Sequence, residues 1–270
     1  MDDRRRDHRI LKEFLALPHR ADAVLEKFAA LPGASRRSGG PAEGFVYRPG
    51  TRKNAVLLVA HADTVGDEND GILLAETDRV IFNRRGILGA DDRAGCAMLW
   101  LLRDTGHGLL VTDGEEYGGV GAAFLTTEHP EIYDEINRRY RFMIQIDRRG
   151  RGEFKCYGVG TEEFRAYVAQ TTSFTEPDRS KSTDIAHLCR DICGVNLSCG
   201  YYDEHTETEH IVKKEWYDTL TLLRRWLADP ELPAFPLKGG ESFERKLSGL
   251  ISLWQQVRPE PGSRNEKDER

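Results

Sequence analysis

Residues 55–63 read AVLLVAHAD, and this stretch decides the fold. The apolar run from Ala55 to Ala60 is unbroken and does not alternate with polar residues. Such a run is typical of a strand that is buried on both faces of a parallel sheet. It is followed at once by His61 and Asp63, two polar side chains at the end of the predicted strand.

Two further apolar runs are also followed by polar side chains. The run at 109–112 is followed by Glu115 and Glu116, and the run at 142–146 is followed directly by Asp147. In open α/β sheets, ligands bind beyond the carboxyl ends of the strands. We therefore expect these acids and His61 to face one crevice.

The rest of the chain alternates between predicted strands and helices, which indicates an α/β fold with a largely parallel sheet. A Gly/Ser/Pro-rich loop is predicted from 33 to 44. The predicted helices lie within 8–31 (divided at Pro18), at 91–104, from 120 onward, at 184–193 and at 212–227. The predicted strands are 55–60, 80–82, 109–112, 142–146, 153–157 and 195–199.

Four segments follow from this pattern. Residues 1–43 are expected to form N-terminal helices and a loop that pack on a catalytic domain at 44–230. A C-terminal helix is predicted at 231–256, because apolar residues recur there at helical spacing. The polar residues 257–270 are expected to be a disordered tail.

Composition restricts the class of protein. The chain has 270 residues, a net charge of −6 and five cysteines. The negative charge argues against a nucleic-acid surface. No stretch approaches the ~20 apolar residues of a membrane span, and the N-terminus lacks an apolar signal segment. The odd cysteine count fits a reducing cytoplasm, and Cys189 and Cys193 are expected to pack on one helix face.

Potential metal ligands occur in five motifs in a fixed order. These are HAD at 61–63, GADDRAG at 89–95, the EE pair at 115–116, Asp147 and HTETE at 205–209. Hard carboxylates combined with two imidazoles, delivered from separate strand ends, are what a paired zinc site requires. The series therefore predicts a two-metal hydrolase.

These motifs resemble those of the co-catalytic zinc exopeptidase superfamily. That superfamily includes di-zinc aminopeptidases, carboxypeptidases that release glutamate and acylamino-acid deacylases. The resemblance extends over about residues 54–228, including GGVGA after the EE pair and GYYDEHTETE at 200–209. It implies a three-layer α/β/α fold with a mostly parallel central sheet.

The resemblance also implies a ligand set. His61 and Asp147 would hold one divalent ion, Glu116 and His205 the other, and Asp91 would bridge both. Zinc is the expected metal, with cobalt or manganese as alternatives, since such sites follow metal availability as much as affinity.

Three neighbouring acids have other implied roles. Asp63, two residues after His61, would orient that imidazole as a carboxylate behind the ligand. Glu115 would be the general base that takes a proton from the water between the metals. In relatives the peptide bond after the bridging aspartate is cis, so a cis bond is expected between Asp91 and Asp92.

Two assignments stay open. His205 fits the relatives' pattern of a histidine followed by Ser or Thr with an acid beyond, but His210 is the alternative fifth ligand. Tyr201, Tyr202 and the Ser182–Asp184 segment would either line the substrate pocket or serve as ordinary packing and a helix cap.

The chain departs from its larger relatives. Carboxypeptidases and deacylases insert a dimerisation domain between the fourth and fifth ligand positions, but Asp147 and His205 are only 58 residues apart (205 − 147). The layout is that of a bare single catalytic domain. Lid residues would come from a partner chain, such as a homo-oligomer, or from local loops such as 171–183.

Three functions are compatible with these observations. The first is a cytoplasmic exopeptidase, an aminopeptidase acting on peptides. The second is a deacylase or amidase acting on N-acyl amino acids, for which Arg148 and Arg149 would bind a carboxylate. The third is a non-catalytic metal-binding or interaction module, against which the presence of Glu115 argues. No membrane or nucleic-acid partner is expected.

Overall fold

The computed structural model describes residues 3–66, 71–178 and 182–237. Its helices are α1 (Asp3–Leu15), α2 (Asp22–Ala29), α3 (Ala90–Leu102), α4 (Val120–Glu128), α5 (Pro130–Arg139), α6 (Glu162–Thr172), α7 (Ile185–Leu188) and α8 (Lys213–Leu227). Its strands are β1 (Ser35–Ser38), β2 (Gly44–Arg48), β3 (Leu57–His61), β4 (Leu74–Glu76), β5 (Val80–Asn83), β6 (Gly108–Thr112), β7 (Met143–Arg148), β8 (Phe154–Lys155), β9 (Gly194–Ser198), β10 (Tyr201–Tyr202) and β11 (His210–Val212).

Among the described residues, a seven-stranded sheet has the order β1-β2-β6-β3-β7-β9-β8. Its four central strands, β6, β3, β7 and β9, run parallel, and β2, β1 and β8 join at the edges in antiparallel pairs. The largely parallel central sheet predicted from the apolar runs is confirmed.

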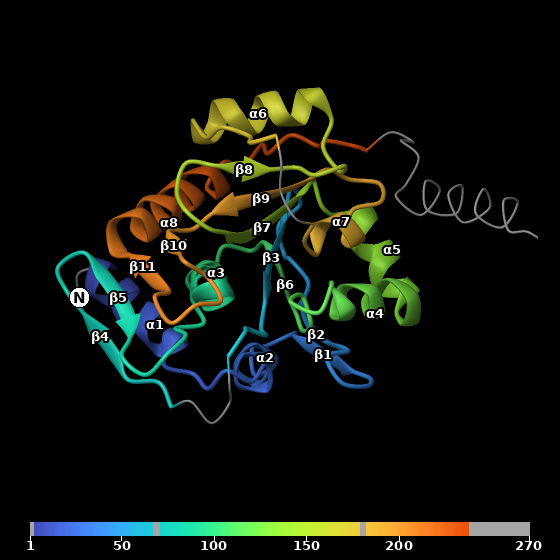
Figure 1. Cartoon of the computed structure of the whole chain (residues 1–270). Coiled ribbons are helices and arrows are strands. Elements are labelled where there is room, and N and C mark those ends of the chain that lie inside the picture. Colours follow the sequence, from blue (N-terminus) through green and yellow to red (C-terminus); the bar gives the residue numbers. More distant parts are fainter. Residues whose placement is uncertain (1–2, 67–70, 179–181, 238–270) are drawn as a thin grey trace, which may run out of the picture. The chain divides into compact units, whose positions relative to one another are not determined.

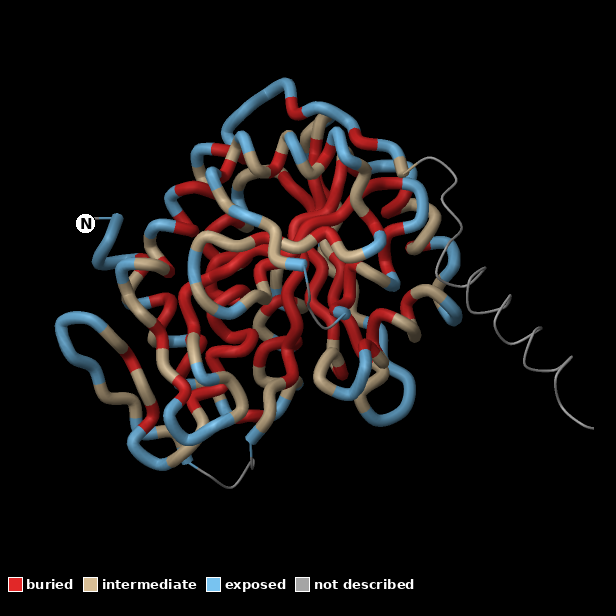
Figure 2. Tube along the Cα trace, turned by 45° about the horizontal axis from the view of Figure 1, so that its top comes forward, coloured by how far each residue is buried: buried red, intermediate tan, exposed pale blue. Residues whose placement is uncertain are grey.

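The sheet is covered on both faces. Because successive residues of a strand point to opposite faces, Leu58 and Ala60 enter one core while Leu57 and Val59 enter the other. The first core includes residues of α1, α2, α3, α6 and α8, and the second includes residues of α4, α5 and α7. Figure 1 shows α3 and α4 on opposite sides of the central strands, and in Figure 2 the buried residues follow these strands. The fold is therefore the three-layer α/β/α arrangement.

A second sheet of four strands was not predicted. Its order is β10-β11-β5-β4 and all its pairs are antiparallel. His210 pairs with Phe82, and Val212 pairs with Val80. This pairing brings the segment that carries HTETE beside the segment that leads into GADDRAG.

The predicted helix at 184–193 is wrong in extent, because α7 ends at Leu188. The side-chain Oδ1 of Asn137 accepts hydrogen bonds from the N–H groups of Arg190 (2.8 Å) and Asp191 (3.0 Å). A continuing helix would use these N–H groups for its own i to i−4 bonds. The chain instead turns into β9.

Two other expectations are corrected. The predicted loop at 33–44 contains β1, which pairs with β2. Cys189 and Cys193 do not share a helix face, since the helix ends before both, although both are buried.

The described chain up to Leu237 forms one compact unit. Residues 231–237 are not helical: the N–H of Phe235 donates to Arg141 O at 3.1 Å, and that of Leu237 donates to Asp191 O at 2.8 Å. The remainder of the predicted C-terminal helix and the predicted tail lie outside the described residues. The domain boundaries at 43 and 230 stay predictions. Within the described ranges, no helix has the length and apolar character needed to cross a membrane.

Candidate metal centre

Three strand ends converge as the sequence predicted. His61 is the last residue of β3, Asp147 lies near the end of β7, and the EE pair lies just beyond β6. Since β6, β3 and β7 are adjacent and parallel, their carboxyl ends lie at the same edge of the sheet. The acids and His61 that were expected to gather at one edge of the sheet therefore do so.

The two histidines face one aspartate from opposite sides. His61 Nε2 lies 3.1 Å from Asp91 Oδ1 and 3.3 Å from Asp147 Oδ1. His205 Nε2 lies 3.4 Å from Asp91 Oδ2 and 2.6 Å from Glu116 Oε1. Each oxygen of Asp91 thus faces a different histidine, which is the arrangement that a bridging carboxylate needs.

Asp63 lies behind this cluster. Its Oδ1 is 3.3 Å from His61 Nδ1, and its two oxygens accept hydrogen bonds from the N–H groups of Glu115 (3.1 Å) and Glu116 (3.0 Å). Burial alone would raise the pKa of Asp63, but His61 and the two N–H groups bring it below its ordinary value. Asp63 therefore remains a carboxylate that touches both the imidazole and the EE loop.

The loop that carries Asp91 has an unusual backbone. The peptide bond between Asp91 and Asp92 is cis, as expected from the resemblance. The Asp92 side chain is buried; its Oδ2 accepts from the His61 N–H at 3.3 Å and its Oδ1 from the Gly95 N–H at 2.9 Å. Asp92 thereby links this loop to the end of β3.

Glu115 and Glu116 are electrostatically different. The Glu116 carboxylate contacts His205, whereas the Glu115 carboxyl sits among other acids. Burial raises the pKa of Glu115, and the charges of Asp91 and Glu116 raise it further, against the lowering effect of His61. The two adjacent glutamates therefore differ in their surroundings: one faces a histidine, and the other is buried near like charges.

The donor set fits divalent cations. Ligand atoms of His61, Asp91 and Glu116 form one group within 4.8 Å of one another, and those of His61, Asp92 and Asp147 form a second. Around a tetrahedral zinc ion, neighbouring ligand atoms lie about 3.3 to 3.5 Å apart, close to most of the separations here. So many buried carboxylates repel one another unless cations lie between them.

Sequence reasoning missed a set of hydrogen bonds around Asp147. Thr183 Oγ1 donates to Asp147 Oδ2 at 2.7 Å, and Gln145 Nε2 donates to the same oxygen at 2.9 Å. Thr183 belongs to the segment for which pocket lining and a helix cap were the alternatives. Asp184, the residue at the cap position of α7, bonds Thr112 instead of the helix.

A buried arginine was also missed. Arg93 is 1% exposed, and its Nη2 donates to Pro18 O at 2.6 Å and to Arg20 O at 3.3 Å. Burial lowers the pKa of Arg93 to about 10, while the nearby charges of Asp63 and Asp92 act in the opposite direction. Its position two residues after Asp91 was visible in the sequence, but nothing in the sequence showed that it is buried.

The alternative fifth ligand lies elsewhere. His210 is in β11, where its ring stacks on that of Tyr202 at 5.6 Å and its Nδ1 lies 2.9 Å from Thr208 O. Tyr201 is closer to the centre, with its hydroxyl 3.4 Å from Asp147 Oδ1. The structure brings His205, and not His210, next to Glu116.

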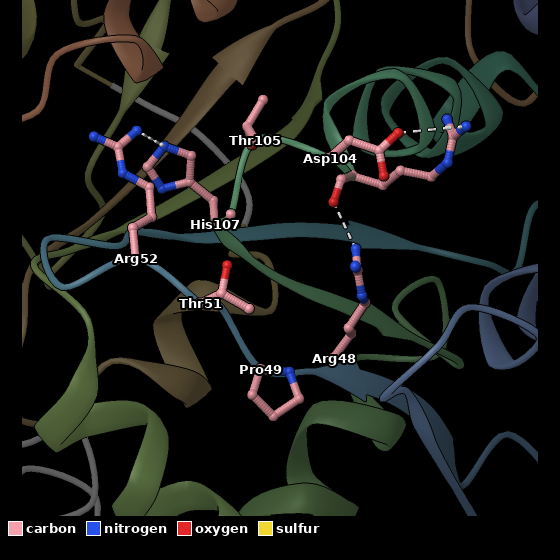
Figure 3. Close-up of a pocket in the computed structure, with 9 residues that line it drawn as sticks. Arg48, Pro49, Thr51, Arg52, Asp104, Thr105 and His107 are labelled. Atoms are coloured by element: carbon pink, nitrogen blue, oxygen red, sulfur yellow. Dashed lines mark hydrogen bonds and ion pairs between the residues drawn. The ribbon is translucent and has the colours of Figure 1, made fainter.

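A cavity of about 390 Å³ lies at the other edge of the sheet, between the loops that precede β3 and β6. Figure 3 shows Arg48 and Arg52 on either side of Thr51 in this cavity. Arg48 Nη1 donates to Arg103 O at 2.5 Å, and Arg52 Nη1 donates to Leu227 O at 2.6 Å. These arginines connect neighbouring segments of the chain. They lie near the amino-terminal ends of β3 and β6, whereas the candidate metal centre lies at the carboxyl ends.

The fold and the candidate centre define a class of metal-dependent α/β hydrolases. The model of peptidase family M28 matches residues 45–184, which is half of the chain. The chain belongs to peptidase family M28. The resemblance to the co-catalytic zinc exopeptidase superfamily is thereby confirmed.

Solved structures with the same fold include three peptidases. Aminopeptidase PepT from Bacillus cereus has a TM-score of 0.59 at 17% identity, over 82% of this chain and 96% of that chain. A tripeptidase from Staphylococcus aureus has a TM-score of 0.59 at 14% identity, over 84% and 99%. An aminopeptidase from the archaeon Desulfurococcus kamchatkensis has a TM-score of 0.58 at 14% identity, over 84% and 95%. No curated protein matches the chain.

Proposed function

We propose that this protein is a two-metal exopeptidase, an aminopeptidase that removes residues from the N-terminus of peptides. His61 and Asp147 would hold one ion, Glu116 and His205 the other, and Asp91 would bridge them. Zinc suits the mixture of imidazole and carboxylate donors. The observation that carries this proposal is the placement of Asp91, with one oxygen 3.1 Å from His61 and the other 3.4 Å from His205.

In the proposed mechanism, some acidic residues bind the metal ions and one acts as the general base. Bound ions would lower the pKa of a water molecule and polarise the substrate carbonyl. Glu115 is the general base: it removes a proton from the water and then delivers that proton to the leaving amine. Asp63 accepts from the N–H groups of Glu115 and Glu116. These bonds keep the proposed base, Glu115, and the proposed ligand, Glu116, at a fixed position relative to His61.

The charges around the centre favour an amine substrate over a carboxylate. Arg148 and Arg149, the candidates for binding a carboxylate, are engaged by acids: Arg148 Nη2 lies 2.5 Å from Glu153 Oε2 and Arg149 Nη1 lies 3.0 Å from Glu204 Oε1. The centre itself is lined by carboxylates. Three of these carboxylates, Asp91, Glu116 and Asp147, are proposed ligands whose charge the bound ions would neutralise, so the preference for an amine rests on the engagement of the two arginines.

Replacement of Glu115 by Gln tests the proposal. The amide keeps the size of the side chain but does not accept the proton, so kcat should fall by at least about 10³-fold while metal content stays at two ions per chain. Glu128→Gln, an exposed acid at the end of α4, is the control and should be fully active. Metal content is measured by elemental analysis, and activity on aminoacyl and N-acyl amide substrates with and without chelator.

The substrate panel separates the alternatives. Chelator-sensitive release of N-terminal residues supports the aminopeptidase. Cleavage of N-acyl amino acids alone would replace it with a deacylase, and two bound ions without turnover would favour a non-catalytic module. Near-wild-type activity of Glu115→Gln would show that Glu115 is not the general base.

A further inference from the structure

Glu209 closes the HTETE motif and is not part of the proposed ligand set. Its side chain is buried, with 1% of the residue exposed. Its Oε2 accepts a hydrogen bond from the Gly89 N–H at 2.7 Å, and its Oε1 accepts one from the Asp91 N–H at 3.0 Å. Glu209 thus reaches a backbone segment 118 to 120 residues away in the chain.

These two N–H groups belong to the start of α3. The first N–H groups of a helix have no partner within the helix, and Ser, Thr, Asp or Asn at the preceding position normally accepts from one of them. In α3 the regular helical turns begin after Asp92, because Asp91 and Asp92 have non-helical backbone angles, and Asp92 Oδ1 caps them by accepting from the Gly95 N–H at 2.9 Å. Glu209 has a different role: from another part of the fold, it accepts from the N–H groups of Gly89 and Asp91 in the irregular segment before these turns. Buried N–H groups of this kind need such partners.

The same contact joins the two segments that approach each other at the candidate centre. Asp91, whose N–H Glu209 holds, supplies the proposed bridging carboxylate. Four residues before Glu209 on its own segment is His205, whose Nε2 lies 3.4 Å from Asp91 Oδ2. The two segments are therefore joined at two places. His205 lies beside the Asp91 carboxylate, and the Glu209 carboxylate accepts from the main-chain N–H groups of Gly89 and Asp91.

We propose that Glu209 is a positioning residue that sets the distance between the bridging aspartate and the last histidine, and thereby the affinity of the centre for metal. This inference rests on the proposed function. A carboxylate is required because both of its oxygens accept from N–H groups. Glutamine would direct one NH₂ donor at a backbone N–H and lose one of the two bonds.

The test compares Glu209→Gln with Glu207→Gln in the full-length protein. Glu207 lies two residues earlier and is exposed, so it is a matched control. Metal-free proteins are titrated with Zn²⁺ against a competing chelator, which yields the number of sites and the affinity of each. Loss of a residue that orients a ligand typically weakens metal binding by about 10- to 100-fold. We expect this loss for Glu209→Gln with two sites retained, and wild-type affinities for Glu207→Gln.

The thermal stability of the metal-free variants is measured in parallel. A lower Tm of Glu209→Gln with unchanged Zn²⁺ affinities would mean that Glu209 only stabilises the segment around Gly89 and Asp91, and would overturn the proposal. If Glu209→Gln does not fold, Glu209→Asp replaces it: the carboxylate is kept but its reach is shortened, and a weaker Zn²⁺ affinity is again expected.

A failure of the proposed function would look different. In that case the wild-type protein itself would bind no Zn²⁺. The contact is then measured by hydrogen exchange of the Gly89 and Asp91 amides in the metal-free protein. Protection in the wild type that is lost in Glu209→Gln would keep the positioning role, and equal exchange in both would overturn it.

Discussion

At the residue scale, one buried carboxylate contacts three of the candidate site residues. Asp63 contacts the ring of His61 and accepts from the main chain of both glutamates of the EE loop. The sequence predicted the first contact, because residues two apart in an extended segment point to the same side. It did not predict the second contact, since the EE loop follows a different strand.

Replacing Asp63 with Asn should weaken its contact with the His61 ring and its hydrogen bonds from the EE loop. The amide retains one acceptor, but its NH₂ group would face an N–H donor of the EE loop. We expect Zn²⁺ affinity to fall by about 10- to 100-fold, with a comparable loss in kcat/KM. Asp104→Asn, at the cavity of Figure 3, serves as the control. Wild-type affinity in Asp63→Asn would show that the contact with His61 has no effect on the metal.

At the scale of elements, the centre depends on how closely α3 approaches the sheet. A Cβ added at Gly95 would lie 2.1 Å from Ile146 O and 2.4 Å from Asp92 Oδ1. Both neighbours adjoin candidate ligands: Ile146 directly precedes Asp147, and Asp92 follows Asp91, the proposed bridging residue. A glycine is therefore required at this crossing of α3 and β7.

Gly95→Ala is expected to lower the free energy of unfolding by about 2 to 3 kcal/mol, because overpacking in a rigid core displaces its surroundings. Gly158→Ala is the matched control, since a Cβ there meets nothing within 4 Å. Chemical denaturation of the metal-free proteins measures both changes. Equal stability of the two variants would show that α3 can move away from β7 without cost.

His107 joins three elements and provides a pH-dependent prediction. Its Nδ1 accepts from the Val56 N–H at 3.1 Å, just before β3, and its Nε2 lies 3.1 Å from Leu227 O at the end of α8. A ring that accepts at Nδ1 must be neutral, so its other nitrogen donates to Leu227 O. Burial lowers the pKa of His107 from 6.5 to about 4.

The direction of the pH dependence follows from the lower pKa of His107 in the folded chain than in the unfolded chain. Because the unfolded chain binds the proton first, the contribution of His107 is complete above pH 6.5 and is lost as the pH falls toward 4. Relative to His107→Gln, the wild type should lose about 1 to 3 kcal/mol of unfolding free energy over this range. Urea denaturation at pH 7 and pH 4.5 measures the difference. An equal pH dependence of the two proteins would contradict a neutral buried ring.

At the scale of the whole molecule, the distribution of charge links metal binding to stability. The chain carries a net charge of −6, and acids from several elements meet at one edge of the sheet. In the unfolded chain these acids are dispersed, so a divalent ion held by the proposed centre would bind the folded state far more tightly.

Chelation should therefore lower the Tm, and added Zn²⁺ should restore it. A free ion concentration 100-fold above Kd stabilises the fold by about 2.7 kcal/mol per site. Calorimetric scans with chelator, with Zn²⁺ and with Ca²⁺ measure the effect, and Ca²⁺ is the control because it prefers an all-oxygen environment. A Tm that does not respond to Zn²⁺ would argue against a built metal centre.

The central strands and the ligand motifs were predictable because their signals are local. A strand buried on both faces must be apolar throughout, and the residue after it stands at the sheet edge whatever lies beside it. This is why the strands at β3, β6 and β7, with the acids and His61 that follow them, appeared in the sequence pattern. The cis bond after Asp91 was expected only through the resemblance.

The second sheet, the early end of α7 and strand β1 in the Gly/Ser/Pro-rich loop depend on pairing partners outside those segments. β11 pairs with β5 about 130 residues earlier, and α7 stops where Asn137 takes the next N–H groups. The free-energy cost of closing a loop changes only slowly with loop length, so sequence separation does not indicate which segments meet.

By itself, the sequence determined the class of fold, the edge of the sheet at which the polar residues gather, and which residue types gather there. The folded structure was needed to show that His205 rather than His210 faces Glu116, that Arg93 is buried near Asp63, and that Glu209 accepts from the N–H groups of Gly89 and Asp91. The physical reason is that hydrophobic periodicity acts along one element, whereas hydrogen-bond partners and burial are set by side chains from elements brought together only on folding.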